Sequence, residues 1–290
     1  MKKAISLLLA LLMLGSCIAL ADGNKDSRTV IGVDLSDSDI QTVYNAFGIS
    51  RGDVTELTVT NQDERHYLEG LVDEKLIGSR SISCVYIEAL DEGKGLNVSV
   101  KNITWCTPDM YMNAMVTAGI TDANVKIAAP FAVSGTAALT GIYMAYESVT
   151  GEKLDEDAKK VGTKELTVTA ELADAIGSAD STAIVNDLKL MLDEIAQMSD
   201  DEIRAEIKKL ADKYGVELTD SQIDKLVDLC RSMTKLDVQV LKEKVEQVQQ
   251  YLRDLASKSG DIKDFLATVA DTVAEFVSKI IHFFEELFAE

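Results

Sequence analysis

Apolar and polar residues follow two different periods along this chain. Before residue 150, short runs rich in Val, Ile and Tyr alternate with stretches of helical period, whereas after residue 164 apolar residues recur every three or four positions. The first pattern is typical of strands and helices in turn, and the second of amphipathic helices. We therefore predict an α+β protein, in which a mixed α/β part at residues 30–150 is followed by a C-terminal helical bundle at 164–258.

The order of elements within the mixed part matches a known supersecondary arrangement. The predicted strands are rich in β-branched and aromatic residues and lie at 56–60, 82–90, 96–103 and 125–128. Asn61 is the predicted cap of one helix, and another helix starts at Thr107, where Pro108 in the first turn costs no hydrogen bond. The resulting β-α-β-β-α-β order is ferredoxin-like and predicts an α/β sandwich, with an antiparallel sheet covered by helices on one face.

Two helix starts carry a capping-box signal. Ser36 precedes Asp39 by three residues, and Thr219 precedes Gln222 by three. In this motif the hydroxyl accepts a backbone N–H of the first turn, and the second side chain reaches back to the cap. We therefore predict helices that begin directly after Ser36 and Thr219.

Two further segments complete the predicted domain organisation. Residues 151–163 mix Gly, Lys and acidic residues and predict a linker, whereas residues 261–290 carry a broad aromatic face on one side of a helix. The partner or membrane face that we single out comprises Phe265, Phe276, Ile280, Phe284 and Phe288. This helix could close the bundle, bind a partner or another copy, or lie on a membrane surface. The membrane role is the least expected, because interfacial helices usually carry Lys and Arg on the polar face.

The first 21 residues have the composition of a signal peptide. A basic start, Met1–Lys3, precedes an apolar run that is too short to span a bilayer, since spanning needs about 20 apolar residues. Two release sites are present. Ala19–Ala21 fits ordinary cleavage, and Leu14–Cys17 reads as a lipobox in which Cys17 would be lipidated. Both predict a secreted or extracytoplasmic protein, and the second would anchor it to a membrane as a lipoprotein.

The charge of the mature chain limits its partners. Removal of the leader leaves 27 basic and 49 acidic residues, a net charge of −22, and 47% of the full chain is hydrophobic. This composition is that of a globular protein. A body this acidic repels nucleic-acid phosphates and anionic lipid headgroups, so we expect no nucleic-acid partner. Membrane contact would have to come through a Cys17 lipid or the C-terminal helix.

The cysteines predict no metal or disulfide framework. Outside the leader the chain has Cys84, Cys106 and Cys230, without any CxxC or Cys/His cluster. If strands 82–90 and 96–103 form a hairpin, Cys84 lies opposite Lys101, about 16 Å from Cys106 and beyond disulfide reach. We expect the three thiols to act as small core side chains.

Catalytic motifs are absent or isolated. The chain has no GxSxG, HExxH or phosphate-binding glycine loop. Ser232 and Lys235 match SxxK without its companion motifs, and His66 and His282 have no nucleophile placed beside them. A set of acidic residues at helical spacing predicts a solvated face: Asp63, Glu64, Glu69, Asp73 and Glu74. We predict no catalytic residue, metal site or cofactor.

One local sequence offers a candidate ligand site. Ser134, Gly135 and Thr136 lie between a predicted strand and a predicted helix start. The free N–H groups at such a helix end, together with the two hydroxyls, can hold an anion or carboxylate. The alternative is plain helix capping, with Gly135 easing the turn.

An ordered series of characteristic segments lies at 61–68, 77–83, 90–95, 116–120 and 129–141. Together these segments resemble the YpuA-like family of exported bacterial proteins, which is classed under a domain of unknown function. The resemblance implies export to the envelope or beyond and brings no agreed catalytic residues. Cys84, Cys106 and the lipobox depart from the family pattern.

These observations favour two hypotheses of function. The leading one is a non-enzymatic module of the cell envelope that binds an envelope protein or surface component through its helical half or tail. The alternative is a small-ligand or anion-binding protein, or an enzyme, that uses the Ser134–Thr136 turn.

Overall fold

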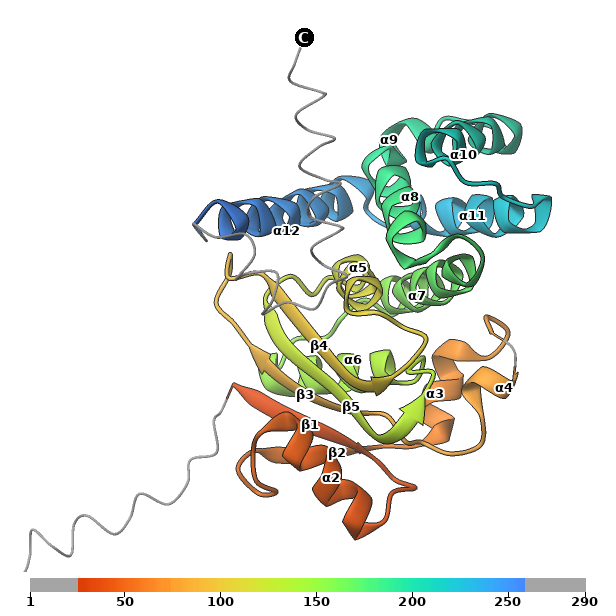
Figure 1. Cartoon of the computed structure of the whole chain (residues 1–290). Helices are drawn as coiled ribbons and strands as arrows, with labels where there is room; N and C mark the ends of the chain where they lie inside the picture. Colours follow the sequence, from red (N-terminus) through yellow and green to blue (C-terminus); the bar gives the residue numbers. More distant parts are fainter. Residues whose placement is uncertain (1–25, 73, 259–290) are drawn as a thin grey trace, which may run out of the picture.

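A computed structural model describes residues 26–72 and 74–258, and its chain runs from a sheet into a helical layer (Figure 1). The strands are β1 Ser27–Gly32, β2 Thr55–Val59, β3 Cys84–Ala89, β4 Leu96–Ile103 and β5 Ala123–Val133. The helices of the first half are α2 Asp37–Phe47, α3 Asn61–Leu68, α4 Glu74–Ile77, α5 Pro108–Ala118 and α6 Ala138–Thr150. The later helices are α7 Glu156–Ile176, α8 Ser178–Leu190, α9 Leu192–Ile195, α10 Asp200–Tyr214, α11 Asp220–Met233 and α12 Val238–Lys258. The α+β class is therefore confirmed.

The five strands form a mixed sheet in the order β2-β1-β3-β5-β4. The pairs β1–β2 and β4–β5 are parallel, and the pairs β1–β3 and β3–β5 are antiparallel. The predicted hairpin is wrong, because β5 lies between β3 and β4. Cys84 and Lys101 both pair with Ala128, from opposite sides of β5. The chain order from β1 to β5 is β-α-β-α-α-β-β-α-β, and the sheet is not the antiparallel one of a ferredoxin-like fold, so the predicted ferredoxin-like order is not confirmed.

Burial explains why β5 and not β4 occupies the interior of the sheet. Along β4, buried Leu96 and Val98 alternate with exposed Asn97 and Ser99, the pattern of a strand with one wet face. On one face of β5 the residues Ala123, Val125, Ile127 and Ala129 are all buried, and on the other face Ala128 is buried while Asn124 and Lys126 are half-buried. Strand β5 is therefore covered more completely than β4. The turn residues after β3 suggest a hairpin, but they do not determine which strand pairs with the edge of β3.

Helices cover both faces of the sheet, which corrects the expectation of a single covered face. On one side α2 packs on Ile31, Cys84 and Ala128 through Val43 and Phe47. On the other side α6 packs on β1 and β3, and α5 packs on β4. Neighbouring strand residues therefore enter different cores, since successive side chains point to opposite faces.

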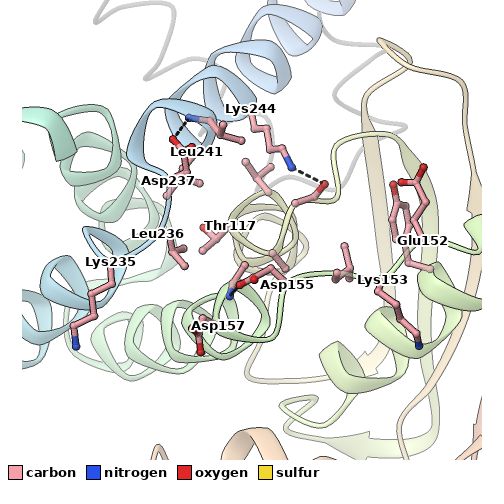
Figure 2. A pocket seen from close by; sticks show the side chains of 17 residues that line it. Thr117, Glu152, Lys153, Asp155, Asp157, Lys235, Leu236, Asp237, Leu241 and Lys244 are labelled. Carbon is pink, nitrogen blue, oxygen red and sulfur yellow. Dashed lines mark hydrogen bonds between the residues drawn. The ribbon is translucent and has the colours of Figure 1, made fainter.

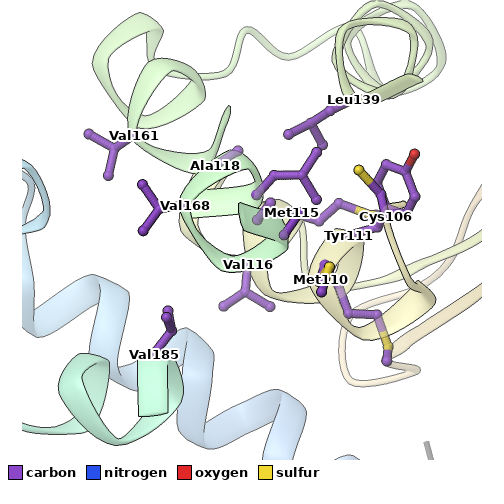
Figure 3. Packing of buried hydrophobic residues seen from close by; sticks show 14 of the residues in the cluster. Cys106, Met110, Tyr111, Met115, Val116, Ala118, Leu139, Val161, Val168 and Val185 are labelled. Atoms are coloured by element: carbon purple, nitrogen blue, oxygen red, sulfur yellow. The ribbon is translucent and has the colours of Figure 1, made fainter. Parts of the chain in front are cut away.

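The predicted linker at 151–163 is too long: residues 151–155 connect α6 to α7, and α7 already begins at Glu156 and packs against α5. Gly162 permits this close approach: a Cβ there would lie 2.6 Å from the Ala114 carbonyl oxygen. Figure 3 shows Met115 of α5 and Val168 of α7 in one cluster of buried residues. That cluster continues through the later helices to Leu252, so the sheet and the bundle share one core.

Several helix starts lie where local capping signals in the sequence predict them. Ser36 and Thr219 both form capping boxes, with Asp39 and Gln222 respectively. The helix predicted from Asn61 has its N-cap one residue earlier, at Thr60. No helix among the described residues is long and apolar enough to cross a membrane.

The three cysteines are buried and free. Burial raises the pKa of Cys84, Cys106 and Cys230 to about 12. Reactive cysteines need a thiolate, so these thiols act as core side chains, as the sequence predicts.

Candidate binding pocket

A pocket of about 530 Å³ opens where α5 ends and α7 and α12 begin (Figure 2). Its wall brings together segments that are far apart in the sequence: Val116–Gly119, Glu152–Asp155 and Lys235–Leu241. Apolar side chains and charged groups both line it. A concave site of this size is suited to a small ligand.

Two aspartates accept backbone hydrogen bonds in the first turns of the helices that begin at the pocket. Asp155 accepts a hydrogen bond from the Ala158 N–H at 2.8 Å, and Asp237 accepts one from the Val240 N–H at 3.1 Å. Free helix N-termini attract anions, but here part of that capacity is already used by the protein's own carboxylates. These two helix ends therefore do not by themselves make an anion site.

Lys244 places a positively charged side chain in the wall of the pocket. Its Nζ donates to the Gly119 carbonyl oxygen at 3.1 Å, at the end of α5. The side chain is half-buried, no carboxylate pairs with it in the described part of the chain, and burial lowers its pKa. Lys153, by contrast, pairs with Glu147 at 2.6 Å. An anionic group that entered the pocket could therefore pair with Lys244.

The rest of the wall limits which anion fits. Val116, Leu154 and Leu241 offer apolar contacts, whereas Glu152 and Asp157 are exposed at the rim. The rim carboxylates repel a polyanion such as a nucleic acid, and the apolar residues favour a ligand with a hydrocarbon part.

Behind the pocket lies a buried ion pair. Thr117 lines the pocket, and its hydroxyl donates to Glu165. Glu165 Oε1 lies 2.9 Å from Lys189 Nζ, and the two side chains have no exposed surface. Burial raises the pKa of Glu165 and lowers that of Lys189. Because the two groups are enclosed and engage each other, we assign them a structural role.

Hydrogen bonds within the protein hold the Ser134–Thr136 turn, for which the sequence predicts a ligand site, and the turn lines none of the described pockets. The hydroxyls of Ser134 and Thr136 both donate to the Leu76 carbonyl oxygen at 3.3 Å, which ties this turn to α4. Gly135 has a φ of +94°, and its carbonyl accepts the Tyr111 hydroxyl at 2.6 Å. Helix α6 begins after Ala137, without a side-chain cap. The three residues line none of the described pockets.

Glu64 corrects the expectation of a solvated acidic face. Its side chain is fully buried, accepts the Ser81 hydroxyl and lies 3.3 Å from the Asn61 amide nitrogen. Burial raises its pKa to about 7. The signal that could have revealed it is its position four residues before Leu68, on the buried face of α3.

Other sequence matches do not assemble into catalytic groups. The Ser232 hydroxyl accepts from Lys164 at 2.8 Å and donates to the Asp228 carbonyl, and neither partner is Lys235. His66 lies on α3, 4.0 Å from Glu156. Within residues 26–72 and 74–258, no three His, Cys, Asp or Glu side chains gather as a metal site would require.

The remaining predicted site residues lie outside the described residues. They are Cys17, Phe265, Phe276, Ile280, Phe284 and Phe288. Their assignments to lipidation and to a partner or membrane face stay predictions.

The fold and pocket define an α+β protein with a mixed five-stranded sheet, a helical layer and a ligand-sized pocket at the ends of α5, α7 and α12. The chain belongs to the family described as "Protein of unknown function (DUF1002)", whose model matches residues 31–251. It is 37% identical over 283 residues to the "Uncharacterized protein YpuA" of Bacillus subtilis (strain 168), over 95% of this chain and 96% of that protein. The predicted family resemblance is thus confirmed. No solved structure matches the chain.

Proposed function

We propose that this chain is an exported, non-enzymatic binding protein of the cell envelope, and that the pocket between α5, α7 and α12 is its ligand site. One observation carries the proposal: a half-buried ammonium, Lys244, lines a pocket of about 530 Å³ without a carboxylate partner among the described residues. An ammonium in this position gains from an anionic ligand group, because burial has weakened its hydration.

The residues that line the pocket indicate the chemical class of its ligand. We infer a small organic acid with one carboxylate and an apolar body. The carboxylate would pair with Lys244, and the hydrocarbon would contact Val116, Leu154 and Leu241. The exposed rim residues Glu152 and Asp157 disfavour ligands with several negative charges.

Octanoate is a suitable probe for this pocket. Titration of the isotope-labelled protein by NMR should shift backbone signals of Gly119, Leu154 and Leu241. Lys244→Met should weaken octanoate binding at least about tenfold, the effect of losing about 1.4 kcal/mol of charge pairing. Octanol should bind more weakly than octanoate to the unaltered protein.

Lys242→Met is the matched control. Lys242 lies on the same helix but pairs with Asp193 at 3.1 Å, outside the pocket. It should leave octanoate binding unchanged. Equal binding by the Lys244 and Lys242 variants, or shifts confined to another surface, would contradict the proposed site.

Export rests on residues 1–21, which have the composition of a leader. Mass spectrometry of the protein from producing cells tests it. A diacylated Cys17 would identify a lipoprotein, and a free Asp22 would identify ordinary cleavage. A chain that retains Met1 would refute export through this leader.

A role for the C-terminal segment in membrane contact is a separate proposal. Vesicle flotation can compare the unlipidated full chain with one that ends at residue 258. Equal flotation of the two would refute it.

The Ser134–Thr136 turn is the second candidate for ligand binding, and its support is weaker. Ser134 and Thr136 already use their hydroxyl protons on Leu76. Only their lone pairs remain for a ligand, and these would repel an anion.

A further inference from the structure

A small cavity with both polar and apolar walls lies beneath α12, at its contact with α5 and α8. Asp109 and Asn113 come from α5, one turn apart, Asn186 comes from α8 and Gln249 from α12. The cavity has a volume of about 20 Å³. Val245, Val248 and Leu252 of α12 form its apolar cover.

Three polar atoms at this cavity lack partners within the protein. Asp109 Oδ1, Asn113 Nδ2 and Asn186 Oδ1 are buried and have no hydrogen-bond partner among the described residues. Each such atom costs about 1–3 kcal/mol if it stays unpaired. More than about 90% of buried polar groups in folded proteins have a partner, counting ordered water. Three unpaired atoms around one cavity therefore point to a bound molecule.

We propose that this cavity is a binding site for one water molecule, held by Asp109, Asn113 and Asn186. A water molecule needs about 10–15 Å³ of such volume and two to four polar partners, and the site offers both. Its two O–H groups match the acceptors Asp109 Oδ1 and Asn186 Oδ1. One lone pair matches the donor Asn113 Nδ2.

A metal cation fits this site less well. Calcium takes six to eight oxygen ligands, and an N–H donor at Asn113 faces the cavity from α5. The Asn113 backbone oxygen is also already engaged, because it accepts a hydrogen bond from Lys189 Nζ at 3.0 Å. Water accommodates either charge state of Asp109, since it can donate to a carboxylate or accept from a carboxylic acid.

The bound water would join α5 to α8 under the apolar cover that α12 provides. The inference does not depend on the proposed ligand pocket, because none of its three polar contacts lines that pocket.

A high-resolution crystal structure of the full chain, grown with rubidium chloride and measured with anomalous data, tests the site. The expected result is one spherical peak without anomalous signal, within about 2.7–3.2 Å of the three polar atoms. A rubidium peak would overturn the proposal in favour of a cation. An empty cavity, or amides paired with each other, would also overturn it.

A solution measurement provides a second test. A long-lived water should give a cross-peak between the water resonance and the Asn113 side-chain amide in the unaltered protein. Asn186→Leu should remove that cross-peak, whereas Asn45→Leu, on the exposed face of α2, should keep it. No cross-peak in the unaltered protein would overturn the proposal whether or not the Asn186 variant folds.

Discussion

Lys189 and Glu165 face each other inside the helical layer, with 2.9 Å between Lys189 Nζ and Glu165 Oε1. The pair joins α8 to α7, and α5 supplies the other partners through the Thr117 hydroxyl and the Asn113 carbonyl. Three helices thus meet at one buried ion pair beside the candidate pocket. Breaking a pair of this kind leaves an uncompensated charge in the core.

Removing one partner should therefore be costly. We expect Lys189→Met to lower the free energy of unfolding by about 3–5 kcal/mol, because Glu165 stays buried without its cation. Urea denaturation at neutral pH measures this. Lys209→Met removes an exposed lysine that pairs with Glu206 and should cost less than about 1 kcal/mol. The double variant Glu165→Leu/Lys189→Met should recover most of the loss, and additive losses would contradict this account.

Glu64 should make stability depend on pH. Its pKa of about 7 in the folded protein is above the ordinary value of about 4.3 expected in the unfolded chain. The folded state therefore holds the proton more tightly. This stabilising contribution is complete below the unfolded pKa and is lost as pH rises through the folded pKa.

Denaturation of Glu64→Gln from pH 5 to 8 tests this prediction. The stability of the variant relative to the unaltered protein should increase as pH rises from 5 to about 7 and then level off, because glutamine has no carboxyl group to ionise. Glu69→Gln, at the exposed end of α3, is the control. A stability difference that is constant over this range would refute the prediction.

Gly162 should resist replacement. A Cβ at this position would lie 2.6 Å from the Ala114 carbonyl oxygen and 2.9 Å from the Tyr143 hydroxyl. We expect Gly162→Ala to destabilise the protein by about 1–3 kcal/mol, through overpacking that outweighs the better helix propensity of alanine. Thermal unfolding followed by circular dichroism measures the change, with exposed Lys160→Ala as the control. An unchanged or raised melting temperature would show that α5 and α7 can move apart without cost.

The Ser134 and Thr136 hydroxyls should matter for stability only. Ser134→Ala with Thr136→Ala removes the two hydrogen bonds to Leu76 and should cost about 0.5–1.5 kcal/mol for each bond. Octanoate binding should be unchanged. Inorganic phosphate serves as a second probe in the same titration. Phosphate binding that is present in the unaltered protein and lost in this variant would favour the alternative site.

Features that depend only on residues close together in the sequence could be predicted. The Ser36 and Thr219 caps each act over three residues, and the alternation of β4 marked a strand with one wet face. Periodicity likewise predicted the apolar faces of the later helices. The linker was predicted too long because the polar residues at 156–163 belong to a helix that packs on α5: Glu156, Asp157 and Lys160 are exposed, whereas Lys159 and Thr163 are buried.

By itself the sequence determined the α+β class, the family and the acidity, and its capping signals located several helix starts, because composition and capping do not depend on contacts between distant segments. Only the tertiary structure decided that β5 separates β3 from β4, that Glu64 is buried, and that Lys244 reaches Gly119 across 125 positions. The physical reason is that an apolar pattern shows which face of an element must be covered. Which element covers it depends on packing between segments that are far apart in the chain.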